Sequence, residues 1–149
     1  MPNSPNMPSL IEDKFAIEEL LACYNQSLDS GDYPTWVACW ADDAILDGIG
    51  KLLAGKPQIQ AFADQYEGST RSKFNGLKHY TVNILSQIDG DSAKSSSYLQ
   101  LVNTTDKGVK IIFTGRYEDD LKRVGGQWKF SRRKLHQDKP PQATAGGSG

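Results

Sequence analysis

The chain has few of the residues that hold metals or cross-link small folds. It contains two cysteines, Cys23 and Cys39, and two histidines, His79 and His136, in 149 residues. Two cysteines are too few for a disulfide scaffold, and neither they nor the histidines have metal-ligand spacing. No phosphate-binding loop and no dinucleotide fingerprint is present. We therefore expect no metal and no cofactor, and we expect both cysteines to be buried helix residues without an activated thiolate.

Long apolar runs and an excess of one charge are also missing. The 17 Lys and Arg residues nearly balance the 18 Asp and Glu residues, which leaves a net charge of -1 and no general attraction to nucleic acid. No apolar run approaches the roughly 18 residues of a membrane-spanning helix, and the N-terminus lacks the features of a signal peptide. We expect a cytoplasmic protein that binds a small molecule, and neither nucleic acid nor a membrane.

The length fits one domain. Residues 1–9 are rich in Pro, Asn and Ser, and residues 139–149 end in the linker-like sequence Gly-Gly-Ser-Gly. Both compositions predict disordered ends, because such segments cannot bury enough apolar surface to become ordered. The folded domain is therefore expected over residues 10–138, and it contains no internal repeat.

The first half of the domain has the hydrophobic periodicity of helices. Apolar residues at spacings of three and four predict an amphipathic helix over residues 11–28. A second helix is expected over residues 33–40, with Pro34 in its first turn, where the missing N–H is not needed. A short strand over residues 44–46 and a third helix over residues 56–66 follow.

After Gly76 the sequence is rich in β-formers, with hairpin signals between the β-rich segments. Strands are predicted over residues 78–88, 93–102, 109–121 and 127–135. Three helices followed by such a meander predict an α+β fold, with the helices packed on a curved antiparallel sheet. A sheet of this kind can curl into a cone that encloses a small-molecule pocket.

Several local patterns, in this order and spacing, resemble the SnoaL-like branch of the NTF2-like superfamily. The matching segments are IEELLACY (residues 17–24), DSGD (29–32), WADDA (40–44), GKP (55–57), KHYTVN (78–83), GRY (115–117) and GQWKF (126–130). The resemblance implies an NTF2-like cone and a homo-oligomer, a dimer or trimer, in which the outer sheet face packs. The family contains polyketide cyclases, isomerases, dehydratases and many non-enzymes, so the site has to decide the function.

The local likeness is greatest to hexachlorocyclohexane dehydrochlorinase and scytalone dehydratase. In these enzymes an Asp after the first helix pairs with a His on the first long strand, and the matching positions here are Asp32 and His79. An Arg on the last strand of the dehydrochlorinase matches Arg133. Its active-site Lys has no counterpart, because Ser27 stands in the matching region. The second catalytic His of scytalone dehydratase has no match either.

A histidine that is hydrogen-bonded to a carboxylate is a workable general base, because the carboxylate fixes the tautomer and leaves the other ring nitrogen free. The alternative is that His79 is a surface residue of its strand and Asp32 caps the second helix. Strict alternation places His79 on the same strand face as Leu85 and opposite Ile84. That face is the more polar one, which suits a polar-lined cavity and solvent equally.

Four further residues are candidates for the site. Tyr24 could donate a hydrogen bond to a leaving group or carbonyl oxygen, or it could be a core residue. Arg133 could stabilise a departing anion, although alternation places it opposite Phe130 and a solvated face is the other interpretation. Trp36 and Trp40 are expected to line the substrate pocket or to pack in the core.

The predicted function is a cofactor-independent lyase that eliminates water or halide from a small, largely apolar cyclic substrate. His79 would take the proton, Asp32 would orient it, and Tyr24 and Arg133 would handle the leaving group. An isomerase or polyketide cyclase that uses the same base is an alternative, and so is a non-catalytic binding module. A hydrolase would need a carboxylate base, for which Asp47 is the candidate.

Overall fold

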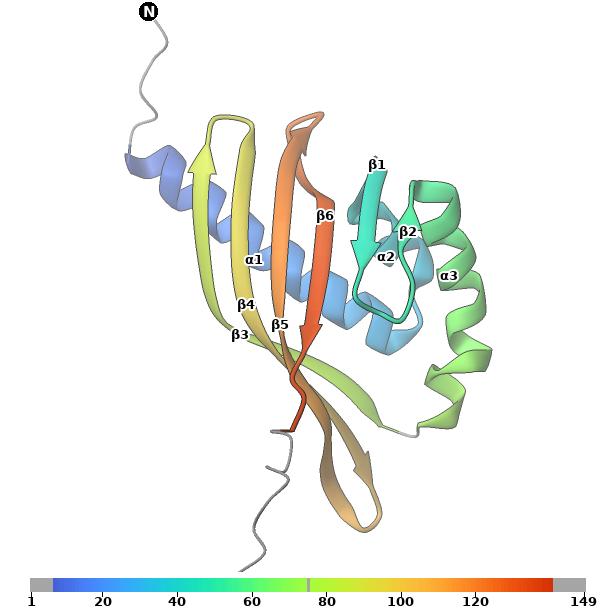
Figure 1. The fold of residues 1–149 in the computed structure, drawn as a ribbon. Helices are drawn as coiled ribbons and strands as arrows, with labels where there is room; N and C mark the ends of the chain where they lie inside the picture. Colours follow the sequence, from blue (N-terminus) through green and yellow to red (C-terminus); the bar gives the residue numbers. More distant parts are fainter. Residues whose placement is uncertain (1–6, 75, 141–149) are drawn as a thin grey trace, which may run out of the picture.

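The computed structural model describes residues 7–74 and 76–140 (Figure 1). The helices are α1 (Met7–Ser30), α2 (Tyr33–Ala38) and α3 (Lys56–Ser69), followed by the short 3-10 helix η1 (Arg71–Lys73). All three predicted helices are present. Helix α1 already begins at Met7, inside the segment predicted to be disordered, and residues 1–6 and 141–149 of the two predicted disordered ends lie outside the described residues.

The strands form one six-stranded sheet with the order β2-β1-β6-β5-β4-β3. They are β1 (Trp40–Asp47), β2 (Leu53–Ala54), β3 (Leu77–Asp89), β4 (Ser92–Thr105), β5 (Gly108–Val124) and β6 (Gln127–Gln137). Strands β3 to β6 are the predicted antiparallel meander. Strand β1 is longer than predicted and pairs with β6 in parallel. The sequence did not predict this pairing, because hydrophobic periodicity identifies a strand and does not identify its neighbour in the sheet.

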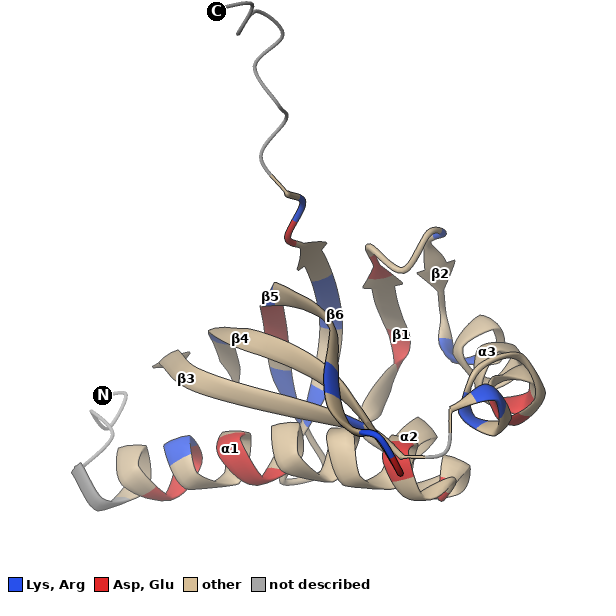
Figure 2. Ribbon diagram, turned by 90° about the horizontal axis from the view of Figure 1, so that it is seen from below, with Lys and Arg blue, Asp and Glu red and all other residues tan. Residues whose placement is uncertain are grey.

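The helices cover the sheet from one side. Helix α1 runs across the face of β3 to β6, and α3 lies beside β1 and β2 at the other end (Figures 1 and 2). The predicted α+β architecture is confirmed. Acidic and basic segments are interspersed on helices and strands in Figure 2, in keeping with the small net charge. Among the described residues, no helix is both long and apolar enough to cross a bilayer.

A bulge in β3 changes which residues face the helices. The register shifts between Val82 and Leu85, where Asn83 takes a positive φ of 55°. Beyond the bulge, Ile84 packs against the core, whereas Leu85 is 73% exposed. The prediction from strict alternation, which placed Leu85 on the face of His79, is therefore wrong, because one extra residue exchanges the two faces of a strand.

A second bulge does the same in β6. Leu121 pairs with Phe130 and Asp120 pairs with Arg132, which leaves Ser131 as the extra residue. Arg133 consequently shares a face with Phe130, and its guanidinium carbon lies 4.5 Å from the centre of that ring. The predicted opposition of these two residues is wrong for the same physical reason as in β3.

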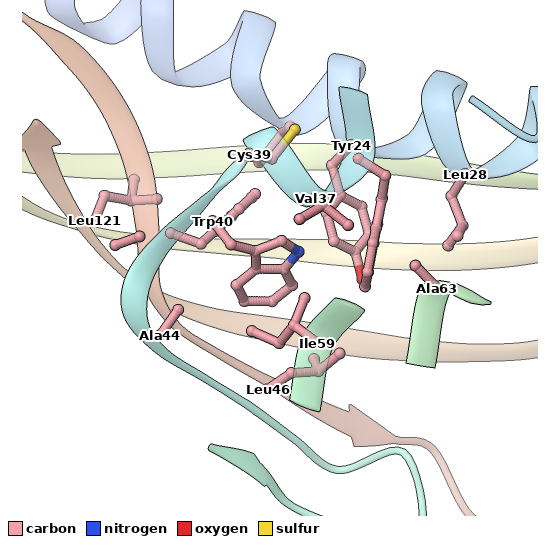
Figure 3. Packing of buried hydrophobic residues seen from close by; sticks show 14 of the residues in the cluster. Tyr24, Leu28, Val37, Cys39, Trp40, Ala44, Leu46, Ile59, Ala63 and Leu121 are labelled. Atoms are coloured by element: carbon pink, nitrogen blue, oxygen red, sulfur yellow. The ribbon is translucent and has the colours of Figure 1, made fainter. Parts of the chain in front are cut away.

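The core is rich in aromatic rings. Tyr24 of α1 contacts Trp36 of α2, Trp40 of β1 and Phe130 of β6, with ring centroids 5.5, 5.9 and 5.5 Å away. Figure 3 shows Trp40 and Tyr24 next to each other beneath α1. Tilted and edge-on pairs of this kind contribute roughly 0.5–1.5 kcal/mol each beyond the burial of their surface.

The face of β3 that is turned away from the helices is apolar and exposed. Tyr80, Val82 and Leu85 are 48, 50 and 73% exposed, and Tyr98, which pairs with Val82 from β4, is 57% exposed. A second copy packed on the sheet would bury this surface. The homo-oligomer expected from the resemblance stays a prediction.

Asp13 ties the first half of α1 to the hairpin of β5 and β6. Its carboxylate accepts two hydrogen bonds from Arg123, at 3.0 and 3.1 Å, and one from the Trp128 indole at 3.1 Å. The guanidinium of Arg123 also lies 4.6 Å from the centre of the Trp128 ring. The hydrogen bonds from Arg123 lower the pKa of Asp13, although burial opposes the shift.

We expect Asp13→Asn to lower the free energy of unfolding at pH 7 by about 1 kcal/mol, because a two-pronged, charge-assisted contact is lost. Since the folded protein lowers the pKa of Asp13, its contribution is present above the pKa of the unfolded chain. It is lost as the pH falls through the folded value. Urea unfolding at several pH values measures this, with the exposed neighbour change Glu12→Gln as control. An Asp13→Asn difference that persists at acid pH would contradict the assignment.

Candidate functional site

A groove of about 620 Å³ runs between α1 and the edge strand β3. We call it the α1–β3 groove. Its lining includes apolar side chains (Leu21, Leu77 and Ile84) and polar ones (Asn25, Asp29, His79 and Thr81). The volume and the mixture of apolar walls with a few polar groups are typical of small-molecule sites.

His79 and Asp29 form a close pair in this groove. His79 Nδ1 lies 2.6 Å from Asp29 Oδ1, and the backbone N–H of His79 donates to Asp29 Oδ2 at 2.9 Å. The two side chains are only 9 and 14% exposed. His79 Nε2 forms no hydrogen bond within the described part of the chain. Because the carboxylate is held by the backbone as well as by the ring, it fixes both the orientation of the imidazole and its Nδ1–H tautomer.

The predicted pairing of His79 with Asp32 is wrong. Asp32 is the N-cap of α2, where its Oδ1 accepts a hydrogen bond from the backbone N–H of Thr35 at 3.3 Å. This is the alternative role that the sequence offered for Asp32. The carboxylate at the start of the same Asp-Ser-Gly-Asp segment, Asp29, is the partner of His79.

The spacing of the contacts between α1 and β3 explains why Asp29 is the partner. One helix turn before Asp29, Asn25 Nδ2 donates to Thr81 Oγ1 at 2.9 Å, and Thr81 lies two residues after His79 on β3. Four residues of helix rise about 6 Å, and two residues of strand rise about 6.6 Å. Successive helix turns therefore meet alternate strand residues. With Asn25 opposite Thr81, only a residue one turn later can reach His79, and that residue is Asp29.

Arg71 holds the last turn of α1 in place, a role that the sequence analysis missed. Its Nε donates to the backbone carbonyl of Asp29 at 3.0 Å, and its Nη1 contacts Glu67 at 2.9 and 3.0 Å. The Tyr33 hydroxyl donates to the same carboxylate at 2.6 Å. Carbonyls at a helix C-terminus lack partners within the helix, so Arg71 satisfies one of them and positions Asp29. The Glu67–Arg71 spacing of four residues in the sequence was the available signal.

The structure places Tyr24, Trp36 and Trp40 in the core and not in the α1–β3 groove. Their exposed fractions are 4, 0 and 1%, and burial raises the pKa of Tyr24 above its ordinary value. The prediction that Trp36 and Trp40 line the substrate pocket is wrong, because their rings fill the space between α1, α2 and the sheet.

Arg133 is buried completely and paired within the fold. Its Nε and Nη2 donate to Asp119 at 2.9 and 3.2 Å, and neither side chain is exposed. The rings of Tyr117 and Tyr24 lie 3.5 and 4.4 Å from the guanidinium carbon. Burial alone would lower the pKa of Arg133, but the Asp119 carboxylate holds it above its ordinary value. The predicted leaving-group role of Arg133 is therefore not supported by its position, since its charge is already compensated away from the groove.

The second histidine, His136, and the hydrolase candidate Asp47 lie outside the α1–β3 groove. His136 is partly exposed and contacts Glu118 at 2.9 Å, and Asp47 lies 3.6 Å from Arg132. Within residues 7–74 and 76–140, no group of three or more His, Cys, Asp and Glu side chains is arranged to hold a metal ion.

A family model described as a SnoaL-like domain matches residues 9–134. The chain belongs to the SnoaL-like family. The family predicted from the local patterns is thus confirmed, and solved structures described as NTF2-like or cystatin-like share its fold.

The similar proteins show the family and the fold of this chain and do not show its activity. The uncharacterized protein Rv2910c of Mycobacterium tuberculosis is 27% identical over 128 residues, which are 83% of this chain and 84% of the relative. Rv3472 of the same organism, a protein of unknown function, is 26% identical with a TM-score of 0.82 over 92% of this chain and 78% of that one. A candidate scytalone dehydratase from Novosphingobium aromaticivorans, at 22% identity and a TM-score of 0.76 over 90 and 89% of the two chains, shares the fold.

The hydrogen bond between His79 and Asp29 leads to a prediction for the imidazole of His79. We expect a slowly exchanging, downfield Nδ1–H resonance, because the Asp29 carboxylate accepts that proton. Asp29→Asn should abolish the resonance, whereas Asp32→Asn, the matched change three residues away, should leave it intact. Proton–nitrogen NMR of protein labelled at histidine measures this, with His136→Gln to assign the two rings. Loss of the resonance in Asp32→Asn alone would contradict the pairing.

The buried ion pair of Arg133 and Asp119 leads to a prediction about stability. Arg133→Met should lower the free energy of unfolding by about 3–5 kcal/mol, because the buried Asp119 carboxylate loses its partner. Adding Asp119→Asn should recover a large part of this loss, since no buried charge then remains. Denaturant unfolding of the single and double variants measures both effects. A double variant as unstable as Arg133→Met would show that the charge is not the cause.

Proposed function

We propose that this protein is an enzyme in which His79 removes a proton from a carbon atom of a small, largely apolar cyclic substrate, with elimination as the favoured outcome. The observation that carries the proposal is the 2.6 Å contact between His79 Nδ1 and Asp29 in the wall of the α1–β3 groove. A carboxylate-oriented imidazole whose second nitrogen is free is the arrangement that general-base catalysis requires.

The roles of the two residues follow from the hydrogen bond. Asp29 accepts the Nδ1 proton, so the lone pair of His79 lies on Nε2. When Nε2 takes a proton from carbon, the electrons of the broken C–H bond form a double bond to the neighbouring carbon, and the leaving group departs from that carbon with its electron pair. The imidazolium that forms is stabilised by the negative charge of Asp29 next to it.

The lining of the groove fits this class of substrate. Leu21, Leu77 and Ile84 line the groove, and the partly buried Ile84 offers most of the apolar surface that these three present to a ring. The amide oxygen of Asn25 is buried and accepts no hydrogen bond within the described residues, and it lies one helix turn from Asp29. We propose that Asn25 and Thr81 bind a polar substituent of the substrate and thereby orient the substrate beside His79. Tyr24 and Arg133, which the sequence suggested for the leaving group, are not part of the proposed site.

Two other functions use the same groove. An isomerase or cyclase would employ the same base and return the proton from Nε2 to another atom. A binding module would use the groove and would need no base, so that the His79–Asp29 pair would serve only to join β3 to α1. The free Nε2 favours a base over a binding module, and the fold shared with a candidate scytalone dehydratase is the reason for preferring elimination among the reactions that use this base.

The base can be tested without knowing the natural substrate. Nitrobenzisoxazole is a small apolar bicycle in which removal of one C–H proton breaks the N–O bond and releases a coloured nitrophenolate. We expect catalysis of this elimination by the wild type, and a decrease of about 100-fold or more in His79→Gln, in the range of general-base contributions. Asp29→Asn should also lower the rate strongly.

Asp32→Asn is the matched control, because it alters a nearby carboxylate that caps a helix and does not touch His79. Its rate should equal that of the wild type. If the wild type gives no rate above that of free imidazole, or if His79→Gln retains the full rate, His79 is not the base and the binding module becomes the better assignment.

A further inference from the structure

The two cysteines are far apart in the sequence and adjacent in the structure. Cys23 lies on α1 and Cys39 is the C-cap residue of α2, and their Sγ atoms are 4.0 Å apart. Figure 3 shows the sulfur of Cys39 directed toward α1. Both are free thiols, Cys39 buried and Cys23 exposed. The expectation that Cys23 is buried is wrong, because its side chain lies beside the buried Cys39 at the margin of the core and remains open to solvent.

The two thiols differ in their access to solvent. Burial, followed by the neighbouring Cys23, raises the pKa of Cys39 to about 12. Cys39 is therefore a neutral thiol at neutral pH, whereas Cys23 is open to solvent. Both residues line a second surface groove of about 590 Å³, which also includes Trp128 and Lys129 of β6 and shares no lining residue with the α1–β3 groove.

We propose that Cys23 and Cys39 form a redox couple that hydrogen peroxide converts into a reversible disulfide between α1 and α2. A disulfide needs the sulfur atoms about 2 Å apart. Closing the gap from 4.0 Å requires a movement of the exposed Cys23 side chain, because Cys39 is held by its contact with the Thr35 carbonyl at 3.4 Å. The exposed Cys23 thiol is the first to react, because peroxide reaches it from solvent and does not reach the buried Cys39.

The reaction balances with one peroxide. The Cys23 thiolate attacks one peroxide oxygen, the O–O bond breaks, and the second oxygen leaves as water after protonation. This gives a sulfenic acid. The Cys39 sulfur then attacks the Cys23 sulfur, the S–O bond breaks, and the oxygen leaves as a second water with the thiol proton. Two thiols are oxidised by two electrons in total, and a dithiol reductant reverses the step.

The bond would close a loop that contains the proposed catalytic carboxylate. The cysteines are separated by 16 positions, and Asp29 and Asp32 both lie between them. Closing such a loop restricts the unfolded chain and stabilises the fold. Since the α1–β3 groove has no residue in common with the groove around the cysteines, the oxidised protein should keep the His79–Asp29 pair. The couple would thus stabilise the junction of α1 and α2 under oxidising conditions.

The test uses the full chain, first fully reduced and then treated with one equivalent of hydrogen peroxide. We expect both free thiols to disappear, the intact mass to fall by two hydrogen atoms, and dithiothreitol to restore the original mass. Trypsin leaves both cysteines on one peptide, residues 15–51, because no Lys or Arg lies between Lys14 and Lys51. The mass of that peptide therefore locates the bond. The oxidised wild type should also melt at a higher temperature than the reduced one.

Two variants separate the couple from ordinary thiol oxidation. Cys39→Ala should leave Cys23 to gain oxygen or to cross-link two chains, with no rise in Tm. Cys23→Ser should keep the Cys39 thiol reduced under the same treatment. The proposal is overturned if the wild type gains oxygen atoms and does not lose two hydrogens, if the disulfide forms only between chains, or if no reaction occurs. None of these readouts depends on catalysis, so they stand apart from the proposed function.

Discussion

The buried ion pair of Arg133 and Asp119 is the contact on which the arrangement of the core depends. A guanidinium is tolerated in an apolar interior only when a carboxylate compensates its charge and aromatic rings cover its faces. Asp119 on β5 provides the charge, and Tyr117, Phe130 and Tyr24 provide the rings. Because Tyr24 belongs to α1, this one polar centre joins the β5–β6 hairpin to the long helix.

The position of α1 in turn determines what the edge strand β3 can do. Helix and strand meet through a row of polar contacts, from Lys14 with Ser86 to Asn25 with Thr81 and Asp29 with His79. The rise per turn of the helix matches two residues of the strand, so the contacts remain in register along the groove. The paired carboxylate and imidazole are therefore a product of helix placement. A polar row at the edge of a sheet also leaves room beside it for a ligand, which a fully packed interior does not.

The two functional proposals use different sides of α1. The α1–β3 groove holds the base, and the groove toward β6 holds the thiols. The segment between Cys23 and Cys39 links them, since it carries Asp29 at the end of α1 and the N-cap Asp32 of α2. Arg71 adds a third support for this segment through the carbonyl of Asp29. The geometry of the proposed base thus rests on a short stretch of chain that is held from several directions.

The sequence by itself determined the three helices, the four long strands of the meander and the family, and it singled out His79 as the proposed base, because hydrophobic period, turn residues and local motifs are encoded along the chain. It could not determine the partner of His79, since Asp29 and Asp32 lie in one short motif and only the docking of α1 on β3 separates them. It also could not determine the inward direction of Arg133 or the proximity of the cysteines. A bulge at Ser131 exchanges the faces of β6, and packing alone brings α2 against α1. The partner of His79, the inward direction of Arg133 and the proximity of the cysteines all depend on contacts between residues that are distant in the chain. Only the tertiary structure therefore determines them.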